Sequence, residues 1–241
     1  MTAEPVPAAL TAVAFQEELA GLASPEQRQK YTRYFPGDDS FAGVRMGDVF
    51  AVAGRALAMP VDQIELLLES PTHEVRAGAC SIMGKAAGRR SVSADRHREL
   101  YDLYLRRHDR IDSWDLVDLG AHQVVGSWLV DKPRDPLDRL AVSSFWPERR
   151  SAIVATAEFI KRRDIVDTLR LARTLVHDEN DFVQKGTGWM LRYAGDVDRD
   201  ALLDFLNENA AGMPRVMLRY AIEHLDPDSR ARYRSGAADI S

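Results

Sequence analysis

Helical periodicity runs through almost the whole chain and constrains the fold more than any other feature of this sequence. Apolar residues recur at intervals of three and four residues in most segments, whereas alternating strand-like runs bounded by turn signals are absent. We therefore predict an all-α protein. The predicted helices cover roughly residues 8–22, 25–34, 47–58, 61–69, 73–87, 94–107, 113–130, 146–161, 163–177, 180–194, 198–208, 213–224 and 227–234.

Helix breakers separate these segments and predict the loops. They are PGDD (36–39), the Ser-Pro pair at 70–71, GRRSVSAD (88–95), DKPRDP (131–136) and GDVD (195–198).

A weak repeat lies within the helical pattern. In LLLESPTHEVRAGACSIMGKAA (66–87), one helix ends, a Ser-Pro turn follows, and the next helix has an early basic residue and a centre of small residues. Segment 173–195 repeats this plan. The early polar positions are Arg76, Asp118, Arg150, Lys185 and Arg215, at steps of 42, 32, 35 and 30 residues. Such periods predict a HEAT-like solenoid with a concave face, a single domain over 1–234, and a flexible tail at 235–241.

The small residues at the helix centres predict close contacts between neighbouring helices. Gly78, Ala79, Gly186 and Gly188 fit close packing between helices, which is the more common reason for small residues in such positions.

The predicted helix 113–130 carries a carboxylate in an apolar setting. On a helical wheel, Asp118 falls inside the apolar arc, one turn beyond Trp114 on the same face. Asp112 and Asp115 fit an N-cap and its reciprocal partner three residues later, but Asp118 lies too far into the helix for that role. Because a buried carboxylate without a partner is costly, Asp118 is a candidate functional residue.

The composition limits the classes of function. No run of 18 apolar residues and no secretion signal are present, and Cys80 is the only cysteine, so we expect a cytoplasmic protein without an internal disulfide. The net charge is −5, but Lys and Arg outnumber Asp and Glu by nine to five in 73–110 and by nine to six in 149–192. Such local excesses fit either solvated helix faces or a surface for nucleic acid.

Familiar catalytic motifs are absent from the sequence. There is no phosphate-binding glycine loop, no nucleophile elbow and no H-E-x-x-H motif, and the six histidines lack metal-ligand spacing, so we predict no metal and no cofactor. What remains is Trp114, Asp118, Arg150 and Trp189. Taken singly, the tryptophans fit core aromatics, and Arg150 fits an ion pair with Asp118. Taken together, the four predict an aromatic slot with one carboxylate and one cation.

At these residues the sequence resembles the AlkD-type DNA alkylation repair family, HEAT-like DNA glycosylases that act on alkylated purines. The matching segments follow the family order over about residues 30 to 225. They are YFPGDDSFAGVRMGDV (34–49), SPTHEVRAGA (70–79), SWDLVD (113–118), RRSAIVAT (149–156) and FVQKGTGWMLRYAG (182–195).

The resemblance implies a role for each of the four residues. Trp114 and Trp189 match the family's two active-site tryptophans, Asp118 matches its essential aspartate, and Arg150 matches its active-site arginine. It also implies a monomer that acts on duplex DNA with alkylated bases and releases N3- and N7-alkylated purines. No lysine belongs to this constellation, so we expect a monofunctional enzyme. The residues expected to contact DNA are Arg76, Arg149, Lys185, Arg192 and Arg215.

A second hypothesis comes from a different class of function. The chain could be a non-catalytic HEAT-like module that binds DNA structures or a protein partner, and the predicted solenoid and the acidic net charge favour that alternative. The set of two tryptophans, one aspartate and one arginine favours the enzyme.

Overall fold

The described part of the chain is helical throughout, as the periodicity predicts. A computed structural model describes residues 10–34 and 40–236, and within these ranges it contains no β-strand, only an isolated bridge between Ser40 and Thr72. The chain divides into two compact units, residues 1–124 and 125–241, and each unit is described by itself. The prediction of an all-α helical repeat is confirmed.

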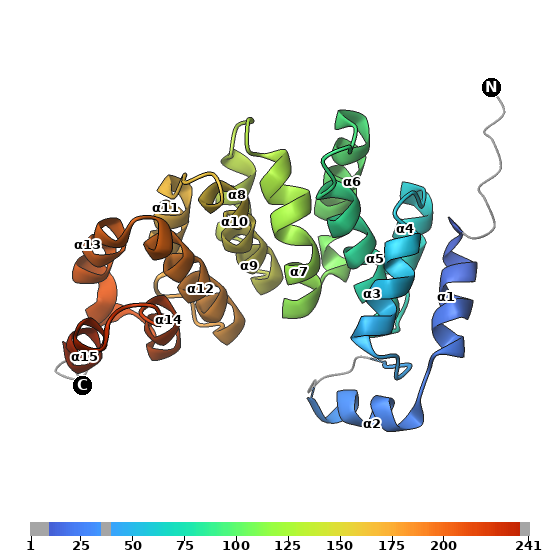
Figure 1. Cartoon of the computed structure of the whole chain (residues 1–241), viewed down its shortest axis with the longest axis horizontal. Coiled ribbons are helices and arrows are strands. Elements are labelled where there is room, and N and C mark those ends of the chain that lie inside the picture. The colour runs from blue at the N-terminus through green and yellow to red at the C-terminus, as the bar shows by residue number, and fades with distance from the viewer. Residues whose placement is uncertain (1–9, 35–39, 237–241) are drawn as a thin grey trace. The chain divides into compact units, whose positions relative to one another are not determined.

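Unit 1 is built around one long central helix. Its elements are α1 (Ala12–Gly21), α2 (Pro25–Tyr34), α3 (Met46–Arg55), α4 (Val61–Leu68), α5 (His73–Ala87), α6 (Ala94–Arg106), a 3-10 turn (His108–Arg110) and α7 (Trp114–Gly120). Helix α5 packs against α3, α4, α6 and α7, and every one of its residues except Lys85 is buried (Figure 1).

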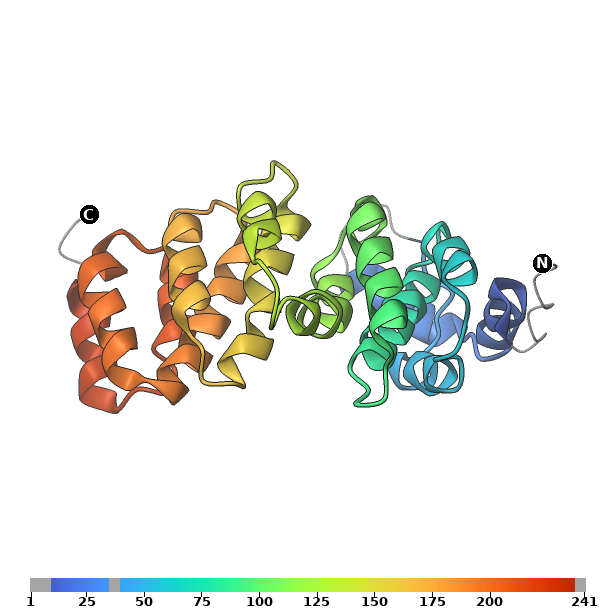
Figure 2. The ribbon, with the colours of Figure 1, turned by 90° about the horizontal axis from the view of Figure 1, so that it is seen from above.

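Unit 2 repeats this plan around a second central helix. Its elements are α8 (Asp135–Ala141), α9 (Trp146–Ala155), α10 (Ala157–Ile160), α11 (Val166–Leu175), α12 (Asp181–Val197), α13 (Arg199–Asn209), a 3-10 turn (Ala210–Gly212), α14 (Arg215–Ala221) and α15 (Pro227–Gly236). Helix α12 packs against α9, α11, α13 and α14. Within each unit most helices lie side by side (Figure 2), whereas α2 runs across the direction of α1 and α3 (Figure 1).

The repeat is visible in the hydrogen bonds of two arginines. In unit 1, Arg76 donates to the carbonyl oxygen of Ser70 (3.4 Å) and to Asp112 (3.2 Å). In unit 2, Arg149 donates to the carbonyl oxygen of Ser143 (2.8 Å) and pairs with Asp178 (2.6 Å). Each arginine therefore binds the carbonyl group six residues before it and an aspartate that lies just before a later helix, α7 for Arg76 and α12 for Arg149.

Close helix packing explains the glycines at the helix centres. A Cβ atom at Gly78 would overlap the ring of Phe15, and one at Gly188 would overlap the carbonyl oxygen of Met217 on α14. The packing interpretation of these two residues is confirmed.

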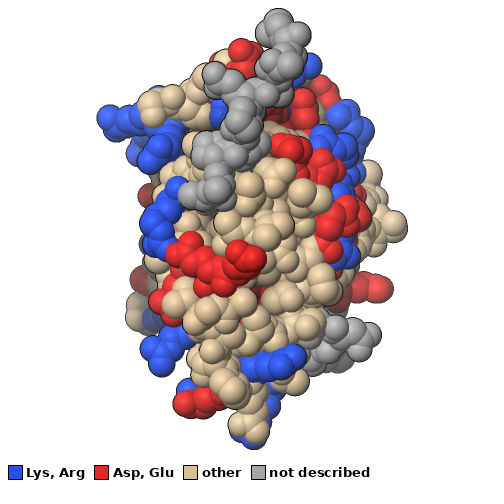
Figure 3. Space-filling model, turned by 90° about the vertical axis from the view of Figure 1, so that its right-hand side faces the viewer, with Lys and Arg blue, Asp and Glu red and all other residues tan. Residues whose placement is uncertain are grey.

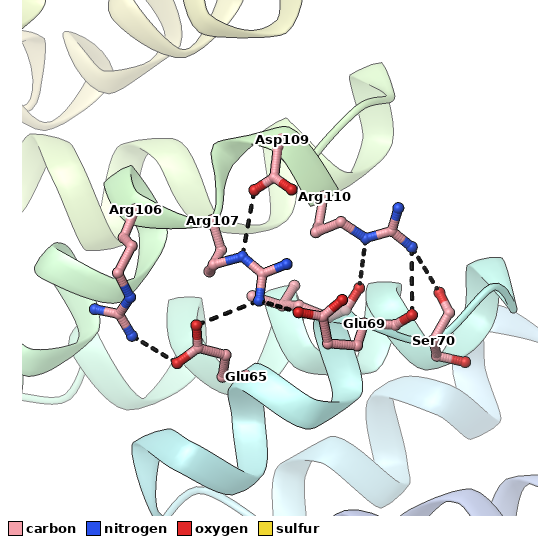
Figure 4. Close-up of polar contacts among 8 residues, drawn as sticks. Glu65, Glu69, Ser70, Arg106, Arg107, Asp109 and Arg110 are labelled. Atoms are coloured by element: carbon pink, nitrogen blue, oxygen red, sulfur yellow. Dashed lines mark hydrogen bonds and ion pairs between the residues drawn. The ribbon is translucent and has the colours of Figure 1, made fainter.

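Charged side chains join α4 to the end of α6 in unit 1 (Figure 4). Arg106 and Arg107 both bind the carboxylate of Glu65, at 2.7 and 3.2 Å, and Arg107 also pairs with Glu69. Arg110 donates to the carbonyl oxygen of Leu68 (3.1 Å) at the end of α4. The last carbonyl groups of a helix lack hydrogen-bond partners within the helix, so Arg110 caps the C-terminus of α4.

The end of unit 1 that carries α1 has a mixed surface. Ala12, Phe15 and Leu19 of α1 are buried, whereas Val13 is exposed. Lys and Arg side chains lie mainly near the edges of this view, and acidic groups reach its middle (Figure 3).

Three segments differ from the predicted helices. The predicted helix 146–161 is divided by a turn at Thr156 into α9 and α10. The breaker DKPRDP (131–136) was expected to be a loop, but α8 begins inside it at Asp135, because proline is well suited to the first turn of a helix. The predicted helix 113–130 is interrupted after Gly120 by a π-helical turn, Ala121–Gly126. Such turns are rare and occur often near functional sites.

The predicted C-terminal tail, 235–241, falls largely outside the described residues, and positions 235 and 236 form the end of α15. Among the described helices, none combines the length and the apolar character that a membrane span requires.

Candidate functional site

A pocket of about 660 Å³ opens on unit 1 between α2, α3 and α7. Aromatic and aliphatic side chains form most of its wall. The lining residues are Gln27, Lys30, Tyr31, Tyr34, Met46, Phe50, Trp114, Asp115, Asp118 and Leu119. Two residues of the sequence prediction, Trp114 and Asp118, therefore lie in one pocket, and several of its other residues were not predicted.

Helix α7 presents Trp114 and Asp118 to this pocket. The two residues are four apart, so they lie one above the other on the same face of the helix. Both are partly exposed, whereas Leu116 and Val117 point into the core of unit 1. The carboxylate of Asp118 is thus beside an aromatic wall, and it is not enclosed in the core as its place in the apolar arc suggested.

The aromatic wall opposite α7 comes from α2 and α3. Tyr31 and Tyr34 lie three residues apart on an otherwise polar helix, and the hydroxyl of Tyr31 accepts a hydrogen bond from the N–H of Met46 (3.1 Å). Burial raises the pKa of Tyr31, and the negative charges of Glu74 and Asp115 add to this effect. This wall was not predicted from the sequence. Its signal in the sequence is the spacing of two tyrosines, which places them on one face of a polar helix.

Asp115 also lines the pocket, and its carboxylate is held from two sides. His73, at the start of α5, is 0% exposed and lies with Nε2 2.8 Å from Oδ2 of Asp115, while Ser113 donates to Oδ1 (2.6 Å). Burial alone would raise the pKa of Asp115, but the hydrogen bond and charge of His73 outweigh burial and lower it. The predicted capping pair is wrong, because Ser113 is the N-cap residue and Asp112 binds Arg76 instead.

Two lysines lie close to the pocket. Lys30 lines it and forms an ion pair with Glu26 (2.8 Å) on the same helix. Lys85 donates to the carbonyl oxygen of Phe50 (2.6 Å), and burial lowers the pKa of its ammonium group. For the residues within 10–34 and 40–236, no group of three His, Cys, Asp or Glu side chains is arranged to hold a metal ion.

The other two predicted catalytic residues belong to unit 2. Arg150 on α9 is only 5% exposed, and its guanidinium donates to the carbonyl oxygen of Phe182 and lies against Gly186, where a Cβ atom would be 3.0 Å from Nη1. Trp189 on α12 is partly exposed, with the ring of Tyr193 edge-on at 5.6 Å.

The five residues expected to contact DNA differ in accessibility. Arg76 is 3% exposed, and both it and Arg149 are held in the repeat contacts described above. Arg192 is ion-paired with Glu223. Lys185 lies 3.5 Å from Asp181, and Arg215 is exposed at the start of α14. Lys185 and Arg215 are therefore the most accessible cations of the five.

The position of α7 depends on a glycine in the neighbouring helix. A Cβ atom at Gly84 of α5 would overlap the carbonyl oxygen of Leu119, the residue after Asp118. We expect Gly84→Ala to lower the free energy of unfolding by about 1–3 kcal/mol, because the backbone of α7 would have to move. Urea unfolding measures the change.

The matched control is Gly54→Ala on α3, where a Cβ atom would meet nothing within 4 Å. That change should be neutral or stabilise the protein by up to about 1 kcal/mol, since alanine favours helix more than glycine does. Equal effects of the two substitutions would show that α5 and α7 do not need this close approach.

Comparison with known proteins gives the family of the chain. Residues 15–225 match the model of a family described as DNA alkylation repair enzyme. No curated protein matches the chain. One similar solved structure is named "Predicted DNA alkylation repair enzyme from Enterococcus faecalis"; it shares 18% identity and a TM-score of 0.67, over 85% of this chain and 97% of that one, a likeness that shows the fold. Because the family match spans most of the sequence, this protein belongs to the DNA alkylation repair enzyme family and has a role in the repair of alkylation damage.

Proposed function

We propose that the protein is a monofunctional DNA glycosylase that hydrolyses the N-glycosidic bond of positively charged N3- and N7-alkylated purines in duplex DNA. One observation carries this proposal: the carboxylate of Asp118 opens into an aromatic pocket beside Trp114. A negative charge in such a setting matches a substrate that brings the compensating positive charge.

The chemistry requires little beyond this carboxylate. An N3- or N7-alkylated purine is already cationic, so the C1′–N bond can break with its electron pair going to the base, which leaves as a neutral molecule. Asp118 stabilises the oxocarbenium-like sugar that remains and orients the water that adds to C1′. The water gives up one proton to Asp118 or to solvent, and the product is an abasic site.

The aromatic wall favours the same substrates. The faces of Trp114, Tyr31 and Phe50 attract cationic groups, each by about 0.5–2 kcal/mol depending on how far water is excluded. A neutral base would gain much less from these faces and from Asp118. The pocket therefore selects substrates by their charge.

Cationic residues of unit 2 supply contacts to the DNA backbone in this proposal. Arg150 is assigned to a DNA phosphate, through charge-assisted hydrogen bonds, and Trp189 to a nucleotide of the bound DNA. Lys185 on α12 and Arg215 on α14, both accessible, bind further phosphates. Such contacts position the DNA without reading its sequence.

Lys30 does not act as a nucleophile in this reaction. A Schiff base with the abasic sugar needs an uncharged amine, whereas the ammonium group of Lys30 is ion-paired with Glu26. Borohydride should therefore trap no covalent complex between the protein and its product, and strand breaks should appear only after alkaline treatment of the DNA.

Substrate charge provides the direct test of the proposed function. We expect 7-methylguanine and 3-methyladenine to be released far faster than hypoxanthine or 1,N6-ethenoadenine, which are neutral at pH 7 and need a general acid to leave. The measurement is single-turnover base release from duplexes that differ only in the lesion. The preference should persist when the neutral lesion sits in an unstable pair, because charge and not access limits the reaction.

Two results would contradict this proposal in different ways. Efficient release of hypoxanthine would mean that a general acid protonates the leaving base. No release of any lesion by a folded protein that still binds DNA would favour the non-catalytic module.

A further inference from the structure

A stacked pair of aromatic rings, which the proposed function does not use, lies at the surface of unit 2. Trp146 is the first residue of α9 and Phe182 is the second residue of α12. Their ring centroids are 5.2 Å apart, with an angle of 28° between the two planes. Trp146 is partly exposed and Phe182 is 36% exposed, so the pair presents aromatic surface to solvent where two helices begin.

The backbone of Phe182 is held by two hydrogen bonds. Its N–H donates to the side-chain oxygen of Asn180 (2.9 Å), which is the N-cap residue of α12. Its carbonyl oxygen accepts a hydrogen bond from the guanidinium of Arg150. Because the backbone that carries the ring is already fixed, a ligand that binds to the ring has less ordering entropy to overcome.

The exposed stripe of α12 continues from this pair. Within 181–194 the residues that are not buried are Asp181, Phe182, Lys185, Trp189, Arg192 and Tyr193. Spacings of three and four residues place most of them on one face of the helix. Nζ of Lys185 lies 5.3 Å from the ring centroid of Phe182. The guanidinium carbon of Arg192 lies 5.5 Å from the ring centroid of Tyr193. Aromatic rings and cations therefore alternate along one surface.

This alternation fits DNA in which a base has left its stack. Proteins that bind such nucleotides combine aromatic rings, on which the bases stack, with cations that bind the phosphates. Inside a fully paired duplex, each base is covered by its neighbours and offers no face to a ring. An aromatic pair at the protein surface can therefore accept a base as a third ring only when that base is unpaired and unstacked.

We propose that Trp146 and Phe182 form a second aromatic contact for DNA, on which one unpaired base stacks next to the phosphate assigned to Lys185. An α-helix rises about 1.5 Å per residue, so Phe182 lies about 10 Å along the axis of α12 from Trp189. Successive nucleotides of a duplex strand rise by about 3.4 Å, which places the unpaired base about three nucleotides from the one at Trp189. The inference rests on the proposed function only in taking Lys185 and Trp189 to face DNA.

Affinity for DNA without a lesion measures this contact apart from base release. The probes are two duplexes of the same sequence, one fully paired and one with a single extra nucleotide in one strand. We expect the wild type to bind the duplex with the unpaired nucleotide about tenfold more tightly, since one stack between a base and an aromatic ring typically changes affinity by about 5- to 150-fold. Fluorescence anisotropy of labelled DNA at one salt concentration gives both dissociation constants.

Two substitutions at one position separate the aromatic ring from its apolar bulk. Phe182→Tyr keeps a ring and should keep the preference for the unpaired nucleotide, whereas Phe182→Leu keeps an apolar side chain and should lose most of that preference. Affinity for the fully paired duplex should stay the same in both variants, because that duplex offers no unstacked base. The control is Val166→Ala on α11, which trims another apolar side chain of unit 2, 70% exposed, and should leave both affinities unchanged.

Photochemical cross-linking locates the unpaired base on the wild-type protein. The extra nucleotide is replaced by 5-iodo-2′-deoxyuridine, which on irradiation forms a covalent bond with an aromatic side chain that it contacts. Cleavage by trypsin after Lys185 separates Phe182, in peptide 174–185, from Trp189, in peptide 186–192. We expect cross-links in peptide 174–185 or in peptide 140–149, which contains Trp146. Mass spectrometry identifies the peptides.

The outcomes keep this inference apart from the proposed function. If no lesion is released but the preference for the unpaired nucleotide depends on the ring at position 182, the glycosylase proposal fails and the aromatic contact stands. If base release occurs but Phe182→Tyr and Phe182→Leu show the same preference, the aromatic contact is wrong. Should Phe182→Leu not fold, cross-linking of the wild type decides. Cross-links confined to peptide 186–192 overturn the inference, as does equal affinity of the wild type for both duplexes.

Discussion

We expect the Asp118→Asn variant to release 7-methylguanine about 10²–10³-fold more slowly than the wild type, with the fold unchanged. Asparagine keeps the shape of the side chain and removes its charge, so the developing positive charge on the sugar loses its main stabilising group. Loss of one such electrostatic contact typically reduces the rate by about this factor. Single-turnover release from a duplex with one lesion measures the effect directly, because substrate binding is then saturated.

The control for this substitution is Asp204→Asn on α13, an exposed aspartate of unit 2. It removes the same charge from the protein and should leave release unchanged. The two variants together exclude a general effect of net charge on DNA binding. Wild-type rates for Asp118→Asn would remove this carboxylate from the mechanism.

The largest effect on stability should come from Glu74→Ala. The carboxylate of Glu74 is fully buried and accepts hydrogen bonds from the N–H groups of Ala42 (3.0 Å), Gly43 (2.7 Å) and Val44 (3.1 Å). Alanine would leave all three donors without an acceptor. We expect the free energy of unfolding in urea to fall by about 3–5 kcal/mol, since each buried group without a partner costs about 1–3 kcal/mol.

Glu17→Ala on α1 is the matched control. It makes the same substitution within a helix, but the side chain of Glu17 is exposed. It should change the free energy of unfolding by less than about 0.5 kcal/mol. A loss below about 1 kcal/mol for Glu74→Ala would mean that the segment before α3 finds other acceptors, or that water reaches its N–H groups.

The helices were predictable where the apolar period and the end signals agree. The predicted helix 73–87 coincides with α5, and the predicted helix 25–34 coincides with α2. Helix α8 was missed because two prolines in DKPRDP outweighed the buried Leu137 and Ala141 that follow. A proline in the first turn of a helix and a proline in a loop look alike in a sequence.

The candidate site was only partly predictable, because some of its contacts join distant parts of the chain. Trp114 and Asp118 lie one turn apart, so their common face follows from helical geometry. Asp115 was assigned to a local cap, whereas its partner, His73, is 42 residues away. No local pattern distinguishes a carboxylate that caps its own helix from one that binds a neighbouring helix. For the same reason Arg76 was expected on the DNA surface and lies in the repeat contact with Asp112.

Helix α2 has a consequence for how this protein can evolve. It forms one wall of the pocket, yet none of its residues is buried, and the hydrogen bond from the N–H of Met46 to the hydroxyl of Tyr31 links it to α3. Substitutions at exposed positions usually change stability by less than about 0.5 kcal/mol. Natural variation on α2 can therefore reshape the pocket for a different adduct while α7, fixed in the core through Leu116 and Val117, keeps Asp118 in place. In the proposed function, the carboxylate that acts on the sugar and part of the wall that contacts the base thus come from different helices, so the two can change separately.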